Sequence, residues 1–269
     1  MRVASAGILS LHHRMIRLFK WFATLVIGVI LGGVLLLLFG IDGITRTLVE
    51  RQTSKALGVP VSLESSSIKF FDERVDLGQL TVANPEGFAE TPFFLRFDTA
   101  TADLALRDLT QSHIELEKLL LETVEIHLDR ADGRSNYRVI LDNLDAYQEE
   151  RGDGGDRTFL IREVVIRDIR VSARLLPFGG NLTRRDLVID EIVLENVGSG
   201  EEAAGLGHIA AVITTAILSA VLQQGSGLFP SDLTEDLGKG LGELGGILQA
   251  AEDVIRGIGE IFQRGESPD

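Results

Sequence analysis

The most apolar stretch of the chain runs from residue 21 to residue 41. Its sequence, WFATLVIGVILGGVLLLLFGI, contains no charged side chain. As a helix it would be about 31 Å long, which matches the hydrocarbon core of a bilayer. Residues 1–20 carry four basic and no acidic side chains. The positive-inside rule therefore predicts a single transmembrane helix, 21–41, preceded by a cytoplasmic basic segment, 1–20.

A cleaved signal peptide is the alternative for the same stretch. Its apolar part is longer than the roughly 7–15 residues of such a segment, and no A-x-A-like cleavage site follows it. We therefore expect an uncleaved, single-pass anchor, with the N-terminus cytoplasmic and the bulk of the chain on the far side of the membrane.

The next segment, residues 42–60, has a helical pattern. Ile44, Leu48 and Ala56 recur at spacings of four and eight residues, which places them on one side of a helix. Gly58 is typical of a helix C-terminus, and Pro60 cannot continue a helix. These residues predict a juxtamembrane stalk helix leaving the bilayer.

From residue 61 to residue 198 the hydrophobic period changes to two, which is typical of strands with one buried and one solvated face. The alternation is clearest at residues 68–70, 80–82, 100–106, 114–116, 124–128, 159–161, 169–175, 187–189 and 192–194. Asp132-Gly133 predicts a tight turn, and 135–150 is a short helix or an edge segment. We expect a curved, groove-like and mainly antiparallel sheet of nine or ten strands, about 45–50 Å across.

The pattern becomes helical again after residue 198. Residues 199–228 predict an apolar helix packing on the sheet, with His208, Thr215, Ser219 and Gln223 forming one wet edge. A second membrane span over 206–222 is the alternative, but the run is short and lacks basic flanks. Residues 229–269 predict a glycine-rich amphipathic helical tail that needs a surface to pack on. The fold class is therefore α+β and mainly β.

Composition narrows the possible functions. The net charge is −14, and the 22 basic and 40 acidic residues after position 20 give −18. An acidic surface argues against nucleic acid as a partner. The chain contains no cysteine, which excludes thiol catalysis, disulfides and cysteine metal sites.

No constellation of residues predicts an enzyme. The five histidines lack the spacing of a metal site, and His127 is expected to be solvated on the polar face of a strand. No G-x-S-x-G sequence occurs. Gly205-Leu206-Gly207-His208-Ile209-Ala210 matches G-x-G-x-x-A, but no strand follows it to complete a dinucleotide site. We therefore name no catalytic, cofactor-binding or metal-binding residue.

Short stretches of the β region form a recognisable series. The most specific is Leu80-Thr81-Val82-Ala83-Asn84-Pro85-Glu86-Gly87-Phe88, a strand followed by an N-P-x-G-F turn. Further pieces follow in the order Leu95-Arg96-Phe97-Asp98, Ala102-Asp103-Leu104, Ile114-Glu115-Leu116, 124–128, Asn136-Tyr137, 175–180 and 189–197. This series, lying within residues 20–222, resembles the AsmA family of bacterial envelope proteins.

The resemblance implies a fold and a role. AsmA-like proteins have one inner-membrane helix and a periplasmic β domain, similar to the repeating β-groove of bridge-like lipid-transfer proteins. It therefore implies a non-enzymatic protein that supports envelope and outer-membrane lipid homeostasis, holding or passing phospholipid or acyl chains in a groove. The expected sheet is too small to bridge the periplasm by itself.

A structural or scaffold role is the alternative. Such a protein would bind envelope protein partners through its sheet or its C-terminal helices, with those helices already filling the apolar face. An envelope hydrolase ranks below both, because no nucleophile or metal constellation supports it.

Overall fold

The computed structural model describes residues 46–69, 72–88, 91–104, 111–149, 158–174, 184–198, 205–247 and 251. The predicted cytoplasmic segment, 1–20, and the predicted transmembrane helix, 21–41, lie outside these residues. The chain divides into two compact units, Met1–Ile44 and Thr45–Asp269. The second unit, described below, joins the predicted β domain and the helices on both sides of it into one body.

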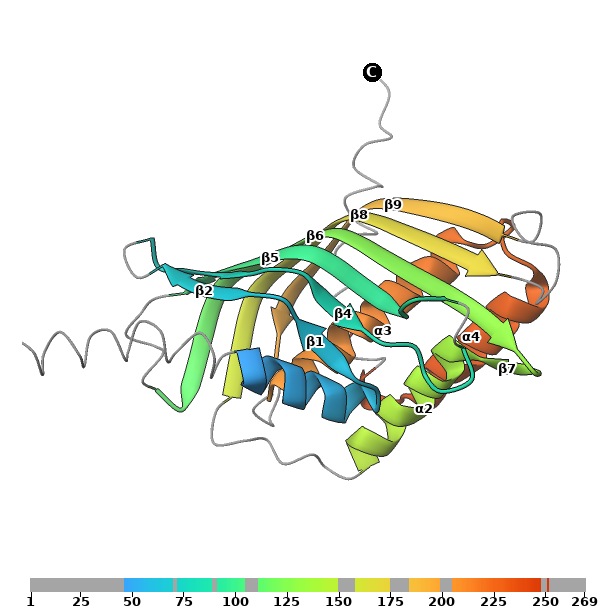
Figure 1. Cartoon of the computed structure of the whole chain (residues 1–269), viewed down its shortest axis with the longest axis horizontal. Helices are drawn as coiled ribbons and strands as arrows, with labels where there is room; N and C mark the ends of the chain where they lie inside the picture. The colour runs from blue at the N-terminus through green and yellow to red at the C-terminus, as the bar shows by residue number, and fades with distance from the viewer. Residues whose placement is uncertain are drawn as a thin grey trace, which may run out of the picture. The chain divides into compact units, whose positions relative to one another are not determined.

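The described strands belong to one mixed sheet of nine strands, which confirms the prediction of a mainly β protein (Figure 1). The strands are β1 (Val61–Leu63), β2 (Ser66–Lys69), β3 (Arg74–Leu77), β4 (Leu80–Val82), β5 (Leu95–Leu104), β6 (His113–Ala131), β7 (Arg134–Ser135), β8 (Thr158–Arg174) and β9 (Arg184–Val197). The described helices are residues 46–57, α2 (Asn136–Glu149), α3 (Leu206–Gln224) and α4 (Ser231–Glu243).

The sheet is narrower than the strand count predicts. Its main path is β1-β4-β5-β6-β8-β9, while β3 also pairs with β5 and carries β2. The backbone N–H of Glu64 donates to Gln79 O and that of Gly78 donates to Ser65 O, both at 2.8 Å. These bonds join β1 to β2 and β4 to β3 as two interrupted strands. The sheet is thus six strands wide, about 24 Å, which corrects the expected 45–50 Å.

One strand pair is parallel. β6 and β8 align from His113–Thr158 to Asp129–Arg174, whereas the other pairs are antiparallel. A parallel pair needs a crossover, and α2 lies within this one. The sequence pattern left residues 135–150 open between a helix and an edge segment, and the structure has the helix.

Two transverse rows interrupt the long strands. Across the first row, neighbouring inward apolar positions are three residues apart instead of two, with two polar residues between them. The polar pairs are Asp98-Thr99 in β5, Glu122-Thr123 in β6, Arg167-Asp168 in β8 and Asp190-Glu191 in β9. Thr123 and Asp168 have φ angles of 56° and 54°. Left-handed residues of this kind bend and twist a strand.

The second row lies nearer the other end of the same strands. Its polar pairs are Glu117-Lys118 in β6, Arg162-Glu163 in β8 and Glu195-Asn196 in β9, and Asn196 has a φ of 55°. Each row adds a residue to the solvated face of adjacent strands at the same level. The same face therefore stays buried while the sheet arches over the helices (Figure 1).

The helices fill the apolar face of this sheet. α3 packs against β8 and β9, α2 packs against β6, and α4 packs against both α2 and α3. Their buried side chains join those of the strands in a single hydrophobic cluster. The apolar face of the groove-like sheet is thus part of a packed core, and α3 packs on it as predicted for residues 199–228.

α3 differs from its predicted environment. Thr215 and Ser219, expected on a wet edge, are 0% and 5% exposed, and neither hydroxyl has a hydrogen-bond partner. By length and composition α3 is the one described helix that could cross a membrane, with a mean hydropathy of 1.7 over its best window. However, 67% of that window is buried inside the fold, as in the core helix of a globular domain.

The predicted stalk helix also belongs to the folded body. Residues 46–57 are helical and end at Gly58, whose φ is 67°. Ala56 and Leu57 are buried in the core. The helix lies along β1, where the Ser54 hydroxyl accepts from Val61 N at 2.9 Å and the Glu50 carboxylate accepts from Leu63 N at 2.8 Å. The structure has a helix in this segment, as the sequence predicts, and these contacts attach residues 46–57 to the sheet.

The C-terminal segment is not one continuous helix. α4 ends at Glu243, and Gly245 has a φ of 49° before helical residues resume at 246. Leu233, Leu237 and Leu241 form the buried face of α4. The remainder of the predicted tail, apart from Ala251, lies outside the described residues.

Candidate functional site

The most elaborate polar structure lies where β6 ends and α2 begins. Asn136, the first residue of α2, is 0% exposed. Its Oδ1 accepts hydrogen bonds from Asp129 N and Tyr137 N, both at 2.8 Å. Its Nδ2 donates to His127 O at 2.8 Å and to Asn84 Oδ1 at 2.9 Å. All four hydrogen-bonding capacities of the amide are therefore used.

The network continues into the turn that follows β4. Asn84 Nδ2 donates to the carbonyl oxygen of Thr91 at 3.0 Å and also to its hydroxyl. The Thr91 hydroxyl donates to Asp129 Oδ2 at 3.2 Å. Asn84 and Asn136, which belong to separate pieces of the series that resembles AsmA proteins, are thus bonded across 52 residues of sequence. They fasten the N-P-x-G-F turn to the start of α2.

A second group of polar contacts holds α4. Tyr137 Oη donates to Asp236 Oδ2 at 2.9 Å, and Ser135 Oγ donates to the same oxygen at 2.8 Å. Arg130 pairs with Asp232 at 2.6 Å and with Asp236 at 3.7 Å. The contacts of Arg130, Ser135 and Tyr137 with the two aspartates of α4 are called the polar clasp below.

A further ion pair and one pKa shift belong to the clasp region. Arg138 of α2 pairs with Glu243 at the other end of α4. Burial, more than any other cause, raises the pKa of Tyr137 well above its usual value. The phenol therefore stays protonated at neutral pH and acts as a hydrogen-bond donor, not as a base.

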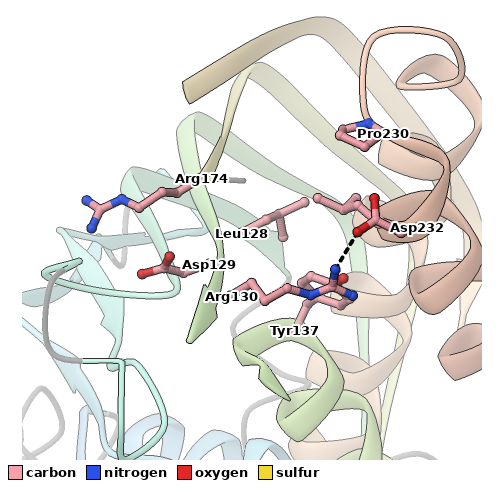
Figure 2. A pocket seen from close by; sticks show the side chains of 8 residues that line it. Leu128, Asp129, Arg130, Tyr137, Arg174, Pro230 and Asp232 are labelled. Carbon is pink, nitrogen blue, oxygen red and sulfur yellow. Dashed lines mark hydrogen bonds and ion pairs between the residues drawn. The ribbon is translucent and has the colours of Figure 1, made fainter. Parts of the chain in front are cut away.

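A small cavity lies beside the polar clasp, with a volume of about 310 Å³. Its lining consists of Leu128, Asp129, Arg130, Tyr137, Arg174, Pro230, Asp232 and Leu233. Figure 2 shows Arg130 reaching Asp232 in front of the Tyr137 ring, while Asp129 and Arg174 extend to the opposite side. The volume is at the lower end of the range of small-ligand sites, and the two arginines are matched by two aspartates.

The arrangement offers little for catalysis. Among the described residues, no group of three or more His, Asp or Glu side chains could hold a metal ion. The residues of the polar clasp bond to one another, so they attach α4 to the end of β6 and the start of α2. No site residue is predicted from the sequence; Asn84 and Asn136 occur there only as members of two of the short stretches quoted above.

Two other sequence features have structural explanations. His127 is half-buried instead of solvated: its ring contacts Phe93 edge-on at 4.7 Å, and burial is the main cause that lowers its pKa. Gly207, from the G-x-G-x-x-A match, lies where a Cβ would come within 3.1 Å of the Gln52 carbonyl oxygen. That glycine permits the close approach of α3 to the first helix, a packing role.

Comparison with known proteins adds no relative. No protein-family model matches the chain, and no curated protein matches it significantly. The resemblance to AsmA proteins therefore depends on the short sequence series and enters only the proposal below.

Proposed function

We propose that this chain is a non-enzymatic, membrane-anchored scaffold protein of the bacterial envelope, similar in type to AsmA proteins. One observation supports this role best: helices α2, α3 and α4 fill the apolar face of the sheet with a single packed cluster. A domain whose groove is already occupied is suited to present its outer surface to protein partners. The anchor 21–41 would hold this surface near the inner membrane.

The outer surface suits that role. The polar face of the sheet carries ion pairs between strands, including Arg96 with Glu125 at 2.8 Å and Arg167 with Glu191 at 2.7 Å. The Arg167–Glu191 pair is exposed and contributes little to stability. The polar face is a solvated surface that carries both acidic and basic side chains.

Topology can be tested directly because the chain lacks cysteine. We would introduce single cysteines as Ser5→Cys and Glu86→Cys and treat spheroplasts with a membrane-impermeant maleimide. The proposal expects Glu86→Cys to react in intact spheroplasts and Ser5→Cys to react only after lysis. Labelling of both positions before lysis, or loss of residue 5 from the mature protein, would contradict the anchor.

A second candidate is the storage or passage of single phospholipids, also implied by the resemblance. The observation that favours it is the polar clasp, because hydrogen bonds and ion pairs attach the N-terminal half of α4 beside an apolar-lined cavity. Release of α4 would expose the apolar surfaces of α2 and α3 on which it packs.

Lipid mass spectrometry of protein purified in a mild detergent separates the two candidates. The scaffold proposal expects no stoichiometric lipid. One phospholipid per chain, increased by Asp236→Asn, which weakens the clasp, would favour lipid handling instead.

A further inference from the structure

The two edge strands of the sheet differ in whether their outward backbone groups are hydrogen-bonded. At the β1 edge, Ser54 and Glu50 accept the N–H groups of Val61 and Leu63, as described above. Arg46 donates from the same helix to the Glu64 carbonyl oxygen at 3.5 Å. Residues 46, 50 and 54 therefore cap the backbone groups that a foreign strand would otherwise use.

The opposite edge is β9, which ends the strand order. It is 14 residues long, and no strand among the described residues pairs with its outer side. Natural proteins usually shorten or cover such an edge. β9 contains no proline, and none of its inward-facing residues is charged. Its only interruptions are the irregular positions at Asp190 and Asn196.

The exposed side chains of β9 have a distinctive charge pattern. Val188 is 60% exposed and lies between two aspartates, at positions 186 and 190. Asp190 and Glu195 are exposed and form no ion pair within the described part of the chain. Val188, Asp190 and Glu195 share the solvated face of the sheet. They are complementary to an extended segment that is basic on this face and β-branched on the other, which is an alternating sequence.

A second copy of this chain fits the same edge poorly. An antiparallel pairing of two β9 strands that kept the apolar face continuous would place Leu187 opposite Leu194 and Ile189 opposite Ile192. The same register would put Asp190 opposite Glu191 and Asp186 opposite Glu195. Like charges directly across a strand pair are destabilising, so this pattern disfavours self-association.

We propose that the β9 edge is a docking site for an extended, basic segment of a partner protein, which adds a strand to the sheet. Backbone hydrogen bonds would supply affinity, and the carboxylates of Asp190 and Glu195 would select basic residues. Val188 would contact the aliphatic stem of a basic side chain of the added strand. This inference depends on the proposed scaffold role and names its binding surface.

The test uses the full chain in detergent and a capped hexapeptide of alternating lysine and valine as the probe. Hydrogen–deuterium exchange would locate binding, and fluorescence anisotropy would measure affinity. We expect the peptide to protect backbone amides of β9 and no other strand. The double variant Asp190→Lys/Glu195→Lys should bind about tenfold more weakly. The double variant Asp72→Lys/Glu86→Lys, an equal change of charge at two exposed positions outside β9, should bind like the unmodified chain.

Three results would overturn the proposal. These are no protection of β9 at millimolar peptide, equal binding by the double variant, or equal binding of a matched peptide of alternating glutamate and valine. If protection of β9 increases with protein concentration in the absence of peptide, and light scattering shows a dimer, the edge binds a second copy of the chain. If β9 binds the peptide but the cysteine labelling fails, only the proposed membrane location is lost.

Discussion

At the scale of single residues, the buried amide of Asn136 should be the most sensitive polar position. Asn136→Ala would leave several buried partners unsatisfied, at roughly 1–3 kcal/mol each. We expect the free energy of unfolding to fall by about 3–5 kcal/mol in urea titrations. Asn143→Ala is a matched control, because the Asn143 side chain makes one hydrogen bond within the described part of the chain, to Leu57 O at 2.9 Å. Its loss should cost about 1 kcal/mol. Equal losses of stability in the two variants would show that the Asn136 network contributes no more than a single hydrogen bond.

The two orphaned hydroxyls of α3 lead to the opposite expectation. Thr215 and Ser219 are buried without partners, and an unsatisfied buried hydroxyl is unfavourable. Thr215→Val and Ser219→Ala should therefore each raise the free energy of unfolding, by about 1 kcal/mol. Thr214, also buried, has no orphaned hydroxyl, so Thr214→Val should bring no gain. A loss of stability in the first two variants would mean that their hydroxyls have hidden partners.

At the scale of elements, the capped edge should respond to pH through Glu50. The backbone N–H of Leu63 is the main cause that lowers the pKa of this carboxyl, with Arg46 adding to it. A lowered pKa in the folded state stabilises the fold above the unfolded pKa of about 4.3. That contribution is lost as pH falls through the lowered folded value.

Urea titrations at pH 7 and pH 3.5 would measure this effect. Glu50→Gln keeps an acceptor oxygen but cannot titrate, so its stability should depend less on pH than that of the unmodified chain. The same pH dependence in both proteins would remove Glu50 as the cause.

Two glycines of α4 test how closely the helices approach. A Cβ at Gly240 would come within 2.7 Å of Leu141 Cδ1, whereas one at Gly242 meets nothing within 4 Å. Gly242→Ala should stabilise by about 0.5–1 kcal/mol through helix propensity. Gly240→Ala should lose that gain to overpacking, which costs about 1–3 kcal/mol. Thermal unfolding of both variants would show the difference, and equal gains would mean that α2 and α4 are not in tight contact.

The elements also show how far sequence pattern reaches. The period-two pattern predicts strands, and the structure has them. The sequence also contains a signal for the two transverse rows at which the strands bend. Pairs of consecutive polar residues such as Glu122-Thr123 and Arg167-Asp168 break the alternation at matching levels of adjacent strands. This signal can be read only after the strands are aligned, because each pair alone is also compatible with a turn between two shorter strands.

At the scale of the whole molecule, sequence pattern predicted a helix packing on the sheet, but it could not give the parallel pairing of β6 with β8. Parallel and antiparallel strands that are buried on one face share the same alternation. α3 is apolar on nearly all sides, so its pattern does not separate a core helix from a membrane span. The site was equally hidden, because the partners of Asn136 lie as far as 52 residues away in sequence.

The filled groove gives the last prediction, on the role of α4 in the fold. Leu233, Leu237 and Leu241 are buried in the shared core, and complete removal of such side chains costs about 2–5 kcal/mol each. Truncation after Pro230 should therefore lower the free energy of unfolding by about 6–15 kcal/mol. This loss is as large as the total stability of a typical domain, about 5–15 kcal/mol, so cooperative unfolding measured by circular dichroism should disappear. Truncation after Ala251, the last described core residue, should leave the transition intact. A folded chain ending at Pro230 that copurifies with phospholipid would instead identify α4 as a removable cover and favour the lipid-handling function.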